Sequence, residues 1–178
     1  MNLILVEFNN KDVDIVYRWK INEKNHECYT CRPLKKFGSI EEYTISITNW
    51  LNIPGNIFLL LKDKETSKSI GEIKGFDLNL RNHSMEFGFY FPEENRNLGY
   101  GNLIVKKFLL FLFEDTRLNI NKLYATTADN NEASKKVLLN NGFTLDGRNR
   151  EHYWINNQRY DQLVYSIVKK EWVEREKI

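Results

Sequence analysis

The sequence predicts an α/β fold of the α+β kind: a mixed, mostly antiparallel sheet of about seven strands with helices on both faces. Three strand-length apolar runs between residues 56 and 91, joined by short polar turns, predict an antiparallel meander. An amphipathic helix then leads to a further buried strand, which requires a crossover. The length of 178 residues, without an internal linker, predicts a single domain over 1–178.

The first third of the chain combines one strand with two helices. Leu3–Phe8 is short and apolar and ends at two asparagines, as a strand does. Asp12 is positioned as the N-cap of a helix, and residues 22–36 are polar and irregular, which predicts a loop or a broken helix. Ser39, followed three places later by Glu42, is a capping box that opens a helix to about residue 51.

The remaining elements follow from the periodicity and the turn residues. The helix over 99–114 has apolar residues at helical spacing, and Gly142 is placed as the C′ residue of a later helix. The predicted strands are Asn56–Lys62, Ser69–Leu80, Ser84–Phe91, Lys122–Thr127, Phe143–Glu151 and Tyr160–Val168, and the predicted later helices are Gly99–Glu114 and Asn131–Asn141.

Composition excludes several classes of protein. The formal net charge of +2 is too small for a protein whose main task is to hold a polyanion, so no nucleic-acid partner is expected. The longest apolar run, Phe108–Phe113, is too short to span a bilayer, and residues 1–10 do not resemble a secretion signal. Cys28 and Cys31 are too few for a disulfide scaffold and lack two further zinc ligands at matching spacing. We therefore expect a cytoplasmic protein without a metal site or a membrane partner.

The turn Arg96-Asn97-Leu98-Gly99-Tyr100-Gly101 is the most informative segment of the sequence. It follows a predicted strand and opens a long helix, whose first amide groups lack intrahelical partners and lie at the positive end of the dipole. Such a helix start binds phosphate groups. Gly99 and Gly101 would let the backbone approach a ligand, and Arg96 would add a positive charge. A plain tight turn with a glycine N-cap is the alternative interpretation.

This R-x-x-G-x-G turn resembles motif A of the GNAT N-acetyltransferases, which cradles the pyrophosphate of acetyl-CoA. Asn97 stands where that family commonly has glycine. The preceding strand, Met85–Glu93, is similar to the x-E-h-G-h-h-h-x-P-E strand (h, apolar) of the RimJ/RimL-like branch. Asn131–Ser134, Val137-Leu138 and Asn141–Phe143 are similar to that branch's N-x-x-S…V-L…x-G-F pattern. The matching features run from about residue 69 to residue 172.

The resemblance implies transfer of an acetyl group from acetyl-CoA to a primary amine by direct attack. It places the general base at Glu86, with Met85, Phe87 and Phe89 as the apolar neighbours that would raise its pKa, and Glu72 as the fallback. It places the donor of a proton to the departing thiolate at Ser134, for which an ordinary first-turn serine is the alternative. The implied acetyl-CoA-binding residues are Phe89, Tyr90, Phe91, Arg96, Asn97, Leu98, Gly99, Tyr100, Gly101, Asn102 and Asn131.

The amine acceptor is the least determined feature. The resemblance implies protein N-terminal amines of ribosomal type, with polyamines and nucleotide-linked amino sugars as alternatives. A polyamine requires an acidic pocket, for which the candidates are Glu23, Glu27, Glu41 and Glu42. His26, Tyr29 and Arg32 are candidates for the acceptor side of the site. A non-catalytic acyl-CoA-binding module and a dinucleotide enzyme are rival interpretations, and a homodimer is compatible with the sequence.

Overall fold

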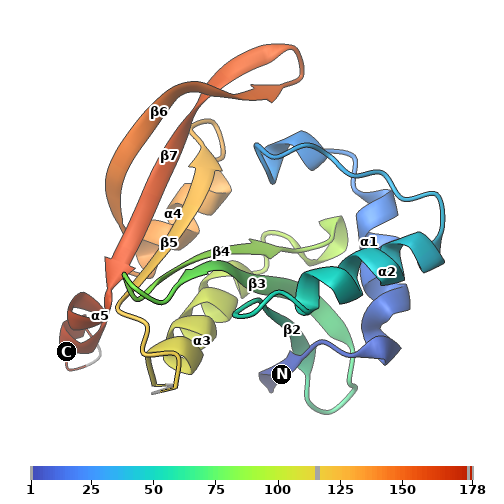
Figure 1. The fold of residues 1–178 in the computed structure, drawn as a ribbon, viewed down its shortest axis with the longest axis horizontal. Helices are drawn as coiled ribbons and strands as arrows, with labels where there is room; N and C mark the ends of the chain where they lie inside the picture. The colour runs from blue at the N-terminus through green and yellow to red at the C-terminus, as the bar shows by residue number, and fades with distance from the viewer. Residues whose placement is uncertain (1, 115–116, 176, 178) are drawn as a thin grey trace.

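The computed structural model describes residues 2–114, 117–175 and 177, and within them the chain forms one seven-stranded sheet in the order β1-β2-β3-β4-β5-β7-β6 (Figure 1). Neighbouring strands are antiparallel except β4 and β5, which are parallel. The mixed, mostly antiparallel sheet predicted from the sequence is thus confirmed. The strands are β1 (Leu3–Glu7), β2 (Ile57–Asp63), β3 (Ser69–Asn79), β4 (Ser84–Tyr90), β5 (Lys122–Ala128), β6 (Thr144–Ile155) and β7 (Gln158–Val168).

Helices cover both faces of the sheet, as expected. The helices are α1 (Val13–Asn22), α2 (Ile40–Leu51), α3 (Tyr100–Glu114), α4 (Glu132–Asn140) and α5 (Lys169–Arg175), with single 3-10 turns η1 (Asn10–Asp12), η2 (His26–Cys28) and η3 (Glu93–Asn95). Helix α5 was not expected from the sequence. None of the helices within the described residues is long and apolar enough to cross a membrane.

Strand β2 shows how the two faces are built. Leu59 and Leu61 pack in the core on the α3 face, whereas Phe58 and Leu60 pack against α1 and α2. Successive side chains of a strand point to opposite faces, so a strand covered on both faces is apolar throughout rather than alternating. The unbroken apolar run of β2 therefore reflects its position between two layers of helices.

The sheet opens between β4 and β5. These strands pair over three positions only, Ser84 with Lys122, Met85 with Leu123 and Glu86 with Tyr124. Beyond them β4 remains paired with β3, and β5 with β7, so the sheet separates into two arms (Figure 1). The opening lies beside β4, the strand that precedes the glycine turn.

The helix caps differ in detail from the sequence prediction. Asp12 directly precedes α1, but its side chain accepts a hydrogen bond from the Asn9 N–H (3.2 Å) and pairs with Lys62 rather than capping the helix. Ser39 does cap α2, accepting from the Glu42 N–H at 3.3 Å. The return bond of the predicted box comes from the Gly38 N–H to Glu42 (2.8 Å), one residue earlier than expected.

Two strand ends were also underestimated. The β6–β7 hairpin is longer than predicted because it continues to a two-residue turn at Asn156 and Asn157, whose φ angles are +49° and +63°. Two positive φ values are the signature of the type I′ turn that fits the twist of a hairpin.

Gly142 follows α4 with a φ of +86°, which confirms its predicted C′ position.

Candidate active site

Glu86 lies at the last position where β4 pairs with β5, and the two arms of the sheet separate beyond it. Its side chain is 14% exposed. One carboxylate oxygen accepts a hydrogen bond from the Thr126 hydroxyl of β5 (3.2 Å), and the other accepts from the Arg32 guanidinium (3.3 Å). The carboxylate therefore bridges both arms of the opening.

Burial raises the pKa of the Glu86 carboxyl, although Arg32 and the Thr126 hydroxyl act to lower it. Met85 and Phe87, expected beside this carboxylate, lie instead in the core on the α3 face, and Phe89 packs against that core. The expectation was wrong because neighbouring residues of a strand point to opposite faces. The upward direction itself suits a general base that works near neutral pH.

Arg32 joins Glu86 to a second carboxylate that the sequence analysis missed. Its guanidinium donates to Asp77 of β3 at 2.6 Å and lies 5.0 Å from the centre of the Phe76 ring. Asp77 has a φ of +53° at an irregularity in the pairing of β3 with β4. The sequence hints at Asp77 only because a charged residue is unusual inside a predicted strand. Thr126 could not be recognised as a neighbour of Glu86 until the register between β4 and β5 was known.

Glu72, the fallback base, has a different partner. Its carboxylate pairs with Lys74 of the same strand at 2.7 Å. In the register of β3 with β4 it lies opposite Tyr90, at the other end of the ladder from Glu86. Glu72 is therefore distant from the point where β4 and β5 separate.

The turn before α3 has the backbone conformation of an anion cradle. Asn97 and Gly99 have φ angles of +61° and +81°. Among the described residues, the amide groups of Asn97 and Gly99 have no hydrogen-bond acceptor. A Cβ added at Gly99 would meet no atom within 4 Å. Free amides, open space and the start of a 15-residue helix together suit a phosphate group.

Gly101, expected to let the backbone approach a ligand, lies instead at the contact between α3 and α4. A Cβ on this residue would lie 2.8 Å from a methyl carbon of Val137, so the missing side chain lets α3 approach α4. The neighbouring Asn102 is also tied to α4, since its side-chain oxygen accepts from Asn140 and Asn141, each at 3.4 Å. These two positions set the packing of the helices beside the turn.

The Arg96 side chain also differs from expectation. Its guanidinium donates to the Phe91 carbonyl (2.9 Å) and forms an ion pair with buried Glu23, beyond the end of α1. It lies 5.6 Å and 5.7 Å from the ring centres of Tyr29 and Tyr90. The positive charge predicted to lie beside a phosphate is thus neutralised by Glu23.

The aromatic strand before the turn divides between the two faces. The rings of Phe89 and Phe91 belong to the core on the α3 face, and the Tyr100 ring lies 6.3 Å from that of Phe91. Tyr90 points the other way, and its hydroxyl donates to the Trp19 carbonyl of α1 at 3.4 Å. An extended ligand beside β4 would therefore contact its backbone rather than these side chains. Beyond Glu86, the edge of β4 that faces β5 pairs with no strand among the described residues.

Asn131 caps helix α4, which begins at Glu132 after β5: its side chain accepts a hydrogen bond from the Ser134 N–H at 3.1 Å. The hydroxyl of Ser134 has no hydrogen-bond partner among the described residues. The cap therefore uses the Ser134 N–H and leaves the Ser134 hydroxyl without a bond to any described residue.

The segment around η2 spans the opening to the β6–β7 hairpin. The Gln162 side chain donates to the Cys31 sulfur at 3.3 Å, and the Asn156 N–H donates to Glu27 at 2.8 Å. Cys28 packs on the small cluster that contains Tyr153, and burial raises its thiol pKa, which makes it a poor nucleophile. Within the described part of the chain, no group of three or more His, Cys, Asp or Glu residues could hold a metal ion.

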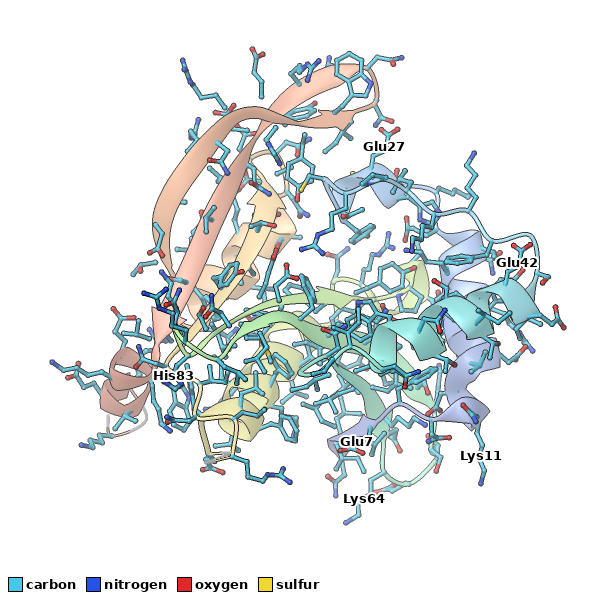
Figure 2. The ribbon with its side chains drawn as sticks, in the orientation of Figure 1. Glu7, Lys11, Glu27, Glu42, Lys64 and His83 are labelled. Carbon is cyan, nitrogen blue, oxygen red and sulfur yellow. The ribbon has the colours of Figure 1, made fainter. Side chains whose placement is uncertain are left out.

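The four acidic candidates for a polyamine pocket are not brought together. Glu23 is committed to Arg96, and Glu27 lies beside the β6–β7 hairpin (Figure 2). Glu41 and Glu42 are in the first turn of α2, and Figure 2 shows Glu42 at the outer end of that helix, away from β5. Of the other acceptor-side candidates, Arg32 contacts Glu86, while the Tyr29 ring packs against Tyr90 at 5.2 Å and burial raises the Tyr29 pKa to about 12.

Comparison with known proteins gives consistent results. A family model described as "Acetyltransferase (GNAT) domain" matches residues 5–164. The chain is 28% identical over 171 residues to the "Uncharacterized N-acetyltransferase YoaA" of Bacillus subtilis (strain 168), covering 94% of this chain and 93% of that protein. It is 30% identical over 102 residues to the "Putative ribosomal N-acetyltransferase YdaF" of the same organism, covering 57% and 55%. A spermidine N-acetyltransferase from Vibrio cholerae, solved with CoA and spermine, superposes with a TM-score of 0.83 at 19% identity over 96% of this chain and 98% of that one.

Proposed function

The chain belongs to the GNAT acetyltransferase family and is an acyltransferase that uses acetyl-CoA; from this premise we propose that it acetylates a primary amine by direct attack, with Glu86 as the general base. The observation that carries the proposal is the position of the Glu86 carboxylate, which lies largely but not fully buried at the point where β4 and β5 separate. Membership of this family speaks against a non-catalytic acyl-CoA-binding module and against a dinucleotide enzyme.

The residues around the turn fit acetyl-CoA. Its diphosphate suits the amides of Asn97 and Gly99 before α3, where the left-handed Asn97 adopts a conformation that glycine commonly supplies in the family. Its pantetheine arm carries amides that suit the β5-facing backbone of β4 beyond Glu86. When bound, acetyl-CoA supplies the acetyl group as an activated thioester.

The protein's part in the transfer is to move protons and exclude side reactions. Glu86 takes a proton from the acceptor nitrogen, directly or through one water, as the N–C bond forms and the C–S bond breaks. The Ser134 hydroxyl relays a proton to the departing sulfur and regains one from water, a role supported by its lack of other partners among the described residues. Direct attack requires no protein nucleophile, which agrees with the raised pKa of Cys28.

For the acceptor we favour a small cationic amine such as a polyamine. Two carboxylates, Asp77 and Glu86, face the single guanidinium of Arg32, so this cluster keeps a net negative charge. A solved structure with the same fold holds spermine. A protein N-terminal amine is the second candidate, favoured by the RimJ/RimL-like motifs and by the name of YdaF. A homodimer also remains a prediction.

Substituting Glu86→Gln tests the proposal. The amide cannot accept the proton, so we expect kcat to fall roughly 100-fold, in the range found for general bases, while the acetyl-CoA Kd changes by no more than about twofold. Turnover is measured as free thiol released with a panel containing spermine, spermidine, a hexosamine and a peptide with a free N-terminus.

The matched variant is Glu72→Gln, which removes the other strand carboxylate on the same sheet. It should keep most of the turnover. Normal turnover in Glu86→Gln together with a large loss in Glu72→Gln would move the base to Glu72.

A further inference from the structure

We propose that Arg32 is a positioning residue for this reaction: it holds the Glu86 carboxylate where β4 and β5 separate, and Asp77 and Phe76 hold Arg32 in turn. The inference deepens the proposed function, because it rests on Glu86 as the base. It assigns a role to the segment between η2 and α2, which otherwise contributes no group to the chemistry.

The contacts form a chain from the surface to the base. Arg32 is half-exposed, with 56% of its side chain accessible, whereas the Glu86 side chain is 14% exposed. The same terminal nitrogen of Arg32 lies 2.6 Å from Asp77 and 3.3 Å from Glu86. Its guanidinium carbon lies 5.0 Å from the centre of the Phe76 ring, within the range of a cation–π contact.

Asp77 is placed for this purpose by an irregularity in the sheet. The pairing of β3 with β4 shifts register between Phe76 and Asn79, and Asp77 has a φ of +53° there. Bulges of this kind redirect a side chain, and aspartate tolerates the left-handed region better than most residues. The shorter of the two ion pairs, to Asp77, thus anchors Arg32 and leaves the longer one to act on Glu86.

The arrangement keeps Glu86 in the form that can accept a proton. Burial alone favours the neutral acid, and the guanidinium opposes this. The other groups around Glu86 are Asp77 on β3, which favours the acid, the Thr126 hydroxyl on β5, which favours the carboxylate, and Tyr124 beside it on β5. Tyr153 on β6 and Cys31 in the η2 segment complete the set. Arg32 is the one cation among these named groups.

The first experiment needs no acceptor. The carboxyl carbon of Glu86 is followed by ¹³C NMR against pH in the full chain, and its signal is assigned from its loss in Glu86→Gln. Arg32→Gln should move the Glu86 titration to higher pH, and Arg32→Lys should restore most of the difference. The control is Arg18→Gln, which removes an arginine of similar exposure (62%) that pairs with Asp14 on α1. An unchanged titration in Arg32→Gln would overturn the proposal.

The second experiment measures kcat/KM against pH with whichever amine of the panel releases thiol, beginning with spermine. Both enzymes use the same acceptor, so the ionisation of the amine cancels in the ratio of the two profiles. We expect Arg32→Gln to lose roughly threefold to tenfold more activity on the acid side of the profile than on the alkaline side. Its melting temperature should change little, because half-exposed ion pairs contribute little stability.

The two proposals fail in different ways. If Glu86→Gln keeps full turnover, the base assignment fails, whatever the NMR titration shows. If Glu86→Gln is inactive but Arg32→Gln has the wild-type titration and a pH-independent loss, Glu86 remains the base and Arg32 has no positioning role.

Discussion

Two glycines close together in the turn before α3 illustrate how one residue type answers two requirements. Gly99 has a φ of +81° and open space at its missing Cβ, so it serves the backbone conformation of the turn. Gly101 has Val137 against its missing Cβ, so it serves the contact between helices. The first requirement concerns a ligand and the second concerns packing, and substitutions should separate them.

Gly99→Glu should weaken acetyl-CoA binding by roughly tenfold or more, because a carboxylate would face the diphosphate at the amide cradle. Calorimetric titration of the variant with acetyl-CoA measures the change. Gly99→Ala is the matched control, since it carries the same strain of a positive φ without the charge. Equal affinities for Gly99→Glu and the wild type would remove the diphosphate from this turn.

Glu23 shows at the residue scale how a buried ion pair links stability to pH. Burial acts to raise its pKa, but hydrogen bonds from the Asn25 N–H and the Arg96 guanidinium, together with the nearby Tyr90 hydroxyl, outweigh it, so the pKa lies below the ordinary 4.5. A carboxyl whose pKa is lower in the folded state stabilises the fold above its unfolded pKa. That contribution is lost as the pH falls through the folded value.

Glu23→Gln should therefore lower the free energy of unfolding by about 2 kcal/mol at pH 7, the scale of hydrogen bonds to a charged group. The difference from the wild type should shrink below pH 4.5. Urea unfolding at pH 7 and at about pH 3.5 measures both values. A difference that stays constant over this range would show that the charge of Glu23 contributes nothing.

At the scale of elements, the close approach of α3 and α4 brings the start of α3 against the middle and the C-terminal end of α4. The contact depends on Gly101 and on the amides of Asn140 and Asn141 that reach Asn102. Each of these residues comes from the side of the helix that faces its neighbour. The geometry of the turn is thus set by a helix that follows it by some thirty residues.

Gly101→Ala should destabilise the protein by about 1–3 kcal/mol, since the new methyl would lie 2.8 Å from Val137. The gain in helix propensity, about 1 kcal/mol, offsets part of this cost. Adding Val137→Ala should relieve the clash, so the double variant should lose less stability than the sum of the two single variants. Thermal unfolding of all four proteins tests the coupling, and strict additivity would contradict it.

The elements themselves were largely predictable from the sequence because their signals are local. The apolar runs, the Ser39 cap and the C′ position of Gly142 were each correct to within a few residues. The extent of β6 was not, since the predicted strand ended at Glu151 whereas β6 continues to Ile155. Pairing with β7 holds that segment extended, and a single-strand pattern does not contain this partner.

The whole molecule has two main cores on one sheet. Leu59 and Leu61 belong to the core on the α3 face, and Phe58 and Leu60 to the core beneath α1 and α2. Since β2 contributes to both, neither core can be exposed without disturbing the other. The domain predicted over 1–178 should therefore unfold as one unit.

Calorimetry tests this prediction: the calorimetric and van't Hoff enthalpies of unfolding should agree. Tryptophan fluorescence and far-UV circular dichroism should give the same midpoint, because Trp19 lies in one core and Trp172 packs against the other. Two separated transitions would show that the helices α1 and α2 form an independent unit.

The sequence by itself determined the order along the chain of the seven strands and of helices α1 to α4, the turn at Asn97–Gly99 and the placement of Glu86 on the strand before it. Only the tertiary structure decided the partners: Arg32 with Asp77, 45 residues away, and Arg96 with Glu23, 73 residues away. It also decided that Met85 and Phe87 take the side of β4 that α3 covers, which leaves Glu86 on the other face. Periodicity and helix caps depend on residues only a few positions apart in the sequence. These contacts depend instead on the register between distant strands and on which face of the sheet each helix covers.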